Sequence, residues 1–145
     1  MDQRAREGFA ESLERHAEAE SGILEEYRIL TEKIAEGPVA MLVDLILTEE
    51  EQHHFLLRTM AKRLREPSPP RAGEELSWVV DRVDVARHAQ KLRRHERETI
   101  EACRQLKSQL PAEDAEFFDA ILDTIILDSE KHERLLSAIE KMIGT

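Results

Sequence analysis

Two stretches of this sequence combine carboxylates with histidines at spacings suited to binding a metal ion. Residues 46–57 read ILTEEEQHHFLL, and residues 125–136 read IILDSEKHERLL. Residues three apart share one face of an α-helix, so Glu50 and His53 can offer an oxygen and a nitrogen to the same ion. Ligands of this kind suit iron or manganese, and the residue types also allow zinc.

The helical projection places these groups on the apolar side of their helices. Successive residues turn by about 100°, so His53 lies at the centre of an apolar stripe, with Glu49 and Glu50 beside it. Glu51 points away, and His54 lies near the edge. The residues at the centres of the other apolar stripes are Glu20, Glu96 and His132. Buried carboxylates without partners are costly, so they are expected to pair, protonate or bind a cation, and their convergence favours the cation.

The sequence contains an internal repeat that predicts two equivalent halves. Residues 46–57 align with residues 125–136, and residues 20–30 align with residues 96–106. The aligned pairs include Ile46 with Ile125, Glu49 with Asp128, His53 with His132, Glu20 with Glu96, and Tyr27 with Cys103.

The elements that must position these residues are helices. The chain of 145 residues has only five Gly and five Pro and is rich in good helix formers, which favours an all-α fold in a single domain, residues 1–145. Breaks at Gly37-Pro38, at EPSPPRAGEE and at Pro111 separate the helices. The expected helices are about 3–36, 38–65, 80–109 and 111–143, with a crossover at about 66–79.

The order of connections, short then long then short, predicts two antiparallel helical hairpins joined by a crossover. Glu20 and His53 lie at similar distances from the turn at Gly37, and Glu96 and His132 lie similarly about Pro111. Each pair is therefore expected to lie side by side within its hairpin.

With these residues in place, the chain resembles the ferritin-like superfamily, in particular the rubrerythrin-type di-iron four-helix bundles. The resemblance covers nearly the whole chain, and its pattern is a Glu on the first and third helices and ExxH on the second and fourth. It implies that Glu20, Glu50, His53, Glu96 and His132 bind metal. Ser129 stands where the pattern has the last Glu, and Asp128 is the candidate to replace it.

The resemblance implies a non-haem site with two iron ions that oxidises iron or reacts with dioxygen or peroxide. Such an enzyme would be a ferroxidase or peroxidase type of oxidoreductase, and a separate protein would donate electrons, since no Cys-rich segment accompanies the helices. Because of Ser129, a single-metal or degenerate site stays open. The alternative is a non-catalytic helical interaction protein whose buried polar groups form a hydrogen-bonded network.

The composition of the chain indicates which kinds of partner and which cellular location to expect. The net charge of -10 argues against nucleic acid, and no apolar run is long enough to span a membrane. The single cysteine, Cys103, is expected to be a small core residue in a protein of the cytoplasm. Apolar side chains beside the two histidine stripes predict either a homodimer face or a broad core stripe: Val43, Leu47, Leu122 and Ile126.

Overall fold

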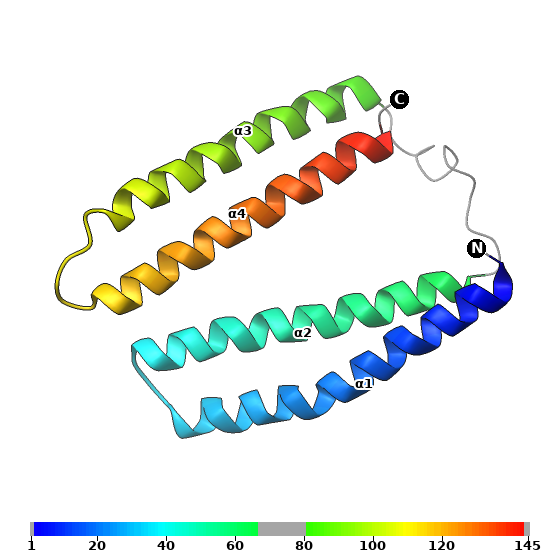
Figure 1. The fold of residues 1–145 in the computed structure, drawn as a ribbon, viewed down its shortest axis with the longest axis horizontal. Helices are drawn as coiled ribbons and strands as arrows, with labels where there is room; N and C mark the ends of the chain where they lie inside the picture. Colours follow the sequence, from blue (N-terminus) through cyan, green and yellow to red (C-terminus); the bar gives the residue numbers. More distant parts are fainter. Residues whose placement is uncertain (1, 67–80, 144–145) are drawn as a thin grey trace. The chain divides into compact units, whose positions relative to one another are not determined.

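The computed structural model describes residues 2–66 and 81–143, and every regular element in these ranges is an α-helix (Figure 1). The helices are α1 (Gln3–Lys33), α2 (Pro38–Arg65), α3 (Arg82–Lys107) and α4 (Ala115–Ile143). The all-α prediction is confirmed for these residues. The predicted crossover at 66–79 lies, apart from Glu66, outside the described residues.

The helices form two hairpins, each of which is a compact unit by itself. In hairpin 1, α1 packs along α2, and in hairpin 2, α3 packs along α4 (Figure 1). Both pairs are antiparallel. Arg65, at the end of α2, contacts Glu7 near the start of α1, and Lys107 at the end of α3 contacts Asp119 near the start of α4.

The side chains that hold each hairpin together follow alternating spacings of three and four residues, and we call these the inner stripes. This spacing is typical of two helices whose axes are nearly aligned where they pack together. The inner stripe of α1 is Arg6, Ala10, Leu13, Ala17, Glu20, Leu24, Tyr27 and Thr31, and that of α2 is Ala40, Val43, Leu47, Glu50, His54, Leu57, Ala61 and Leu64. All of these residues are buried or half-buried.

Hairpin 2 has inner stripes with the same spacing. That of α3 is Ala86, Ala89, Arg93, Glu96, Ile100, Cys103 and Lys107, and that of α4 is Asp119, Leu122, Ile126, Ser129, Glu133, Leu136, Glu140 and Ile143. Ile100, Cys103 and Ile126 form a buried cluster against which Leu122 packs. The prediction that Cys103 is a small core residue is confirmed.

The inner stripes extend the sequence repeat along the full length of the helices. When the sequence alignment of Glu20 with Glu96 is continued, every inner-stripe residue of α3 aligns with an inner-stripe residue of α1. The alignment of His53 with His132 matches the inner stripes of α2 and α4 in the same way. The two hairpins therefore use equivalent positions for packing. The residue types at these positions differ, and the consequences are developed below.

A second stripe on α2 and α4, which we call the outer stripe, is not covered within its own hairpin. On α2 it is Leu42, Ile46, Glu49, His53, Leu56 and Met60, and on α4 it is Ile121, Ile125, Asp128, His132, Leu135 and Ile139. Ile46, Leu56 and Met60 are more than a third exposed, as are Ile125, Leu135 and Ile139. The outer stripe is the one that the sequence projection centred on His53.

The apolar residues predicted for either a dimer face or a broad core stripe belong to the inner stripes. Val43 and Ile126 are buried, and Leu47 and Leu122 are half-buried. Within the described residues these four positions hold the hairpins together, which matches the core-stripe reading.

The helix ends differ from the predicted ones at both turns. Helix α1 ends at Lys33, before the expected residue 36, and Gly37 takes a positive φ of 96° before Pro38 opens α2. That backbone conformation favours glycine. Helix α4 begins at Ala115 and not at Pro111, since Asp114 has a positive φ of 58° that a helix interior cannot contain. Among the described residues, no helix is long and apolar enough to cross a membrane.

Candidate metal centre

The six predicted metal ligands are divided between the two kinds of stripe. The glutamates at 20, 50 and 96 lie on inner stripes and are half-buried. The histidines at 53 and 132 lie on outer stripes, and their side chains are 51% and 49% exposed. Within hairpin 1, therefore, His53 does not lie at the centre of the face that α2 turns toward α1. That face is formed by the inner stripe, which contains Glu50 and His54.

Glu20 has one paired and one unpaired carboxylate oxygen. Its Oε1 atom lies 3.2 Å from Nε2 of His16, one turn earlier on α1. Its Oε2 atom is buried and has no hydrogen-bond partner. A buried carboxylate oxygen without a donor is costly, so this atom is a position where a cation would be stabilising.

Glu50 and His53 lie near each other on α2, as their spacing predicts. The distance from Glu50 Oε2 to His53 Nδ1 is 3.9 Å, and Glu49 Oε2 lies 3.8 Å from the other ring nitrogen of His53. Both distances exceed a hydrogen bond. The imidazole thus lies between two carboxylates.

Glu96 and His132 meet across hairpin 2. The distance from Glu96 Oε1 to His132 Nδ1 is 3.4 Å, and the two residues come from α3 and α4. The prediction that they lie at one level is confirmed. Two ligands on one ion, with bonds of about 2.1 Å, place their donor atoms about 3.0–3.4 Å apart, so this pair has the spacing of two ligands of a common metal. For Glu20 and His53 no direct contact is present.

Asp128 and Ser129 take different directions on α4. Asp128 is half-buried on the outer stripe, where Lys131 Nζ lies 3.0 Å from its Oδ1. Ser129 is buried on the inner stripe, at the position that aligns with Glu50. A serine here packs against α3, so hairpin 2 lacks a carboxylate where hairpin 1 has one.

His54 is the polar residue whose place the sequence projection missed. The projection put it near a stripe edge, but it lies on the inner stripe of α2, and its Nδ1 atom is buried without a hydrogen-bond partner. The signal was present in the sequence as the spacing of Leu47, Glu50, His54 and Leu57. That alternation of three and four marks the contact with α1 better than the strongest apolar stripe does.

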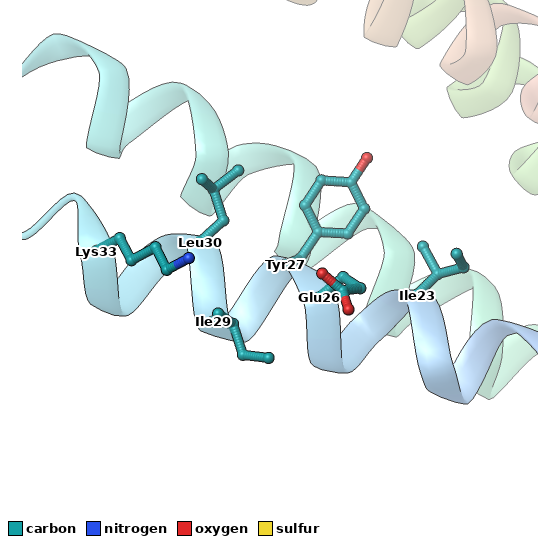
Figure 2. Close-up of a pocket in the computed structure, with 6 residues that line it drawn as sticks. All are labelled: Ile23, Glu26, Tyr27, Ile29, Leu30 and Lys33. Carbon is teal, nitrogen blue, oxygen red and sulfur yellow. The ribbon is translucent and has the colours of Figure 1, made fainter.

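Tyr27 lies beside a shallow hollow on α1. The hollow has a volume of about 310 Å³ and is lined by Ile23, Glu26, Tyr27, Ile29, Leu30 and Lys33. Figure 2 shows the Tyr27 ring standing away from the α1 backbone, with its hydroxyl at the outer end. Because all of the lining residues belong to one helix, the hollow is a surface feature of α1, and it contains only one carboxylate, that of Glu26.

The donor atoms fit a metal ion as pairs. Glu96 with His132 has the spacing of co-ligands, and the unpaired oxygen of Glu20 suits a cation. Across residues 2–66 and 81–143, however, no three such side chains lie close enough together to hold an ion. Within the described part of either hairpin, the predicted ligands therefore lie as pairs or single side chains.

Comparison with known proteins gives no family for this chain. No protein-family model, no curated protein and no solved structure matches it.

Proposed function

We propose that this protein is a ferritin-like metal-binding protein that binds iron through six side chains. The ligands of hairpin 1 are Glu20, Glu50 and His53, and those of hairpin 2 are Glu96, Asp128 and His132. Two iron ions are the preferred occupants, and manganese or zinc can take their place because the ligands are oxygen and nitrogen atoms.

The observation that carries this proposal is the unpaired oxygen of Glu20. Its partner oxygen faces His16 at 3.2 Å, yet Oε2 is buried with no donor near it. A hydrogen-bonded network without metal would supply a donor at that atom. The Glu96–His132 distance of 3.4 Å adds a second ligand pair in the other half of the chain.

The protein's own side chains would divide the work as follows. The three glutamates supply negative charge that balances a divalent cation, and the two histidines are terminal nitrogen ligands. Glu49 Oε2 lies 3.8 Å from His53 Nε2, and it would orient the ring by accepting a hydrogen bond from that nitrogen after a small side-chain rotation. Iron, when bound, supplies one-electron chemistry toward dioxygen or peroxide. Electrons would come from a separate donor protein.

The proposal is tested by measuring metal content in protein purified without chelators from iron-supplemented cells. Wild-type protein is expected to retain iron, and Glu50→Ala and His53→Ala are expected to lose most of it. The matched control is His88→Ala, since His88 is a 69% exposed histidine on α3 outside the proposed ligand set. Protein that neither retains iron nor takes up added Fe²⁺ would overturn the proposal.

The outer stripes favour a second candidate, a non-catalytic helical interaction protein. They present apolar side chains such as Leu56 and Leu135 at about half exposure, and contiguous apolar surface of this kind marks contacts with other protein surfaces. This candidate predicts no metal dependence. Replacing Leu56 and Leu135 together by Lys would change the self-association seen in sedimentation and leave metal content unchanged.

Self-association as a homodimer belongs to both candidates. The surface for it would be outer-stripe residues, because Val43 and Ile126 are buried within their hairpins. Sedimentation at micromolar concentration is expected to show a dimer. A cytoplasmic location is also part of this proposal, since the single cysteine suits a reducing compartment.

A further inference from the structure

Three cross-helix ion pairs of hairpin 2 occupy positions that carry no such pair in hairpin 1. The first is Arg93 with Glu140, whose Nη1 and Oε2 atoms lie 2.6 Å apart. The aligned residues of hairpin 1 are Ala17 and Ala61, both buried. An ion pair in one hairpin thus replaces two alanines in the other.

The other two pairs repeat this arrangement. Lys107 Nζ lies 3.4 Å from Asp119 Oδ1, and the aligned residues of hairpin 1 are Thr31 and Ala40. Arg97 Nε lies 2.5 Å from Glu133 Oε1. The residues aligned with this third pair are Ser21 and His54. In each pair α3 contributes the cation and α4 contributes the anion.

The apolar part of the inner stripes cannot by itself decide which helices pair. Leu24 aligns with Ile100, and Leu57 aligns with Leu136. These are volume-conserving exchanges that packing tolerates well. By apolar packing alone, α3 could pair with α2 as well as with α4.

We infer that the three ion pairs select α4 as the partner of α3 and exclude α2. In a pairing of α3 with α2, Arg93 would face Ala61 and lose its anion. Lys107 would face Ala40 in place of Asp119 and would keep only Asp44, the residue aligned with its other partner, Asp123. The same rule applies between two copies of the chain, where α3 of one copy can pair with α4 of the other copy but not with its α2. This inference is independent of the proposed metal function.

The selection comes from the cost of the wrong pairing. Side chains of Arg93 and Glu140 are 27% and 18% exposed, so they are largely withdrawn from water. A correctly paired ion pair adds little net stability, but one partner left alone in such a position is strongly unfavourable. Discrimination by unpaired charges is a common means of specifying helix partners.

Cysteine cross-linking in the full chain tests the inference, with Cys103 as the fixed reporter. Cys103 packs against Ile126 of α4, and Leu47 of α2 is the residue that aligns with Ile126. Ile126→Cys and Leu47→Cys are refolded from urea separately and treated with a short bismaleimide. The same reporters are placed in a variant whose three ion pairs are replaced by the hairpin 1 residues: Arg93→Ala, Glu140→Ala, Lys107→Thr, Asp119→Ala, Arg97→Ser and Glu133→His.

With the natural charges, mass spectrometry is expected to find the link from residue 103 to residue 126 and at least about ten-fold less of the link to residue 47, matching a difference of about 1.4 kcal/mol. In the exchanged variant, the two links should approach equal yield. If the ratio of the link to residue 126 over the link to residue 47 is the same with and without the charges, the inference is overturned. If the exchanged variant shows no helical circular dichroism, Arg93→Glu alone replaces it, and the rise of the link to residue 47 must then be reversed by adding Glu140→Arg.

Discussion

Hairpin 1 and hairpin 2 share their packing positions and differ in the chemistry placed there. At one aligned level, hairpin 1 has Ala17 and Ala61, each 1% exposed, and hairpin 2 has the Arg93–Glu140 pair. Small side chains let helices approach closely, whereas an ion pair spans a wider space. One spacing of inner-stripe residues therefore supports two different kinds of helix contact.

The same comparison explains the surroundings of the two central glutamates. Glu20 lies one turn after His16, which contacts it on α1 itself. The residue aligned with His16 is Leu92, so Glu96 has no histidine one turn earlier on α3, and it contacts His132 of α4. The two aligned glutamates therefore contact histidines in different ways, one within a helix and the other between two helices.

The largest effect is expected when hairpin 1 receives one charge of hairpin 2. Ala61→Glu places a carboxylate opposite Ala17 without a partner, and we expect it to lower the free energy of unfolding by about 3–5 kcal/mol. Adding Ala17→Arg should recover part of the loss. Urea denaturation measures both, and an additive or larger loss in the double variant would contradict the comparison.

Removing one partner of the hairpin 2 pair should have a smaller effect. Arg93→Ala leaves Glu140 unpaired, with its Oε1 atom already buried and without a partner. Because Glu140 keeps some contact with water, a loss of about 2 kcal/mol is expected. The double variant with Glu140→Ala reproduces the alanines of hairpin 1 and should be more stable than the single variant in the same measurement.

Ser129→Glu gives hairpin 2 the carboxylate that hairpin 1 has at Glu50. Ser129 is 4% exposed, so without metal the new carboxylate should cost about 1–2 kcal/mol. Added Zn²⁺, a redox-inert probe, should restore the melting temperature and bind more tightly than to wild-type protein. The same loss with and without Zn²⁺ would argue against a metal-binding role for this level of α4.

Lys107→Thr, which copies Thr31, should have the smallest effect and a distinct pH dependence. Hydrogen bonds to Asp123 and then to Asp119 raise the pKa of Lys107 above its ordinary value of 10.5. A raised folded-state pKa means that the stabilisation is complete below the unfolded pKa and is lost as the pH rises through the folded one. Urea midpoints of wild type and variant should differ equally from about pH 6 to pH 9 and converge above about pH 11. A difference that persists at alkaline pH would show that packing alone is responsible.

Much of the local structure could be predicted from the sequence, because helix formers and breakers act locally. The helix at Pro38–Arg65 has the predicted bounds, and the contact of Glu96 with His132 agrees with the prediction that both lie at a similar level relative to the turn at Pro111. The start of α4 could not be predicted, since Pro111 is a good first helical residue but Asp114 adopts a positive φ.

The projection misplaced His54 for a physical reason. Helices α2 and α4 each carry two apolar stripes, and a helical projection points toward the more apolar one, which on α2 is the outer stripe. The inner stripe of α2 contains Glu50, His54 and two alanines, so it looks polar although it is the contact with α1. Spacing, and not total hydrophobicity, identifies the contact between the helices of a hairpin.

The most direct test of metal binding by both halves is an anaerobic calorimetric titration of the metal-free protein with Fe²⁺. We predict two ions bound per chain, with one lost in the hairpin 1 variant Glu20→Gln and one lost in the hairpin 2 variant Glu96→Gln, while His88→Ala binds both. The absence of binding heat in the wild-type protein, or binding that neither glutamine variant changes, would contradict the account.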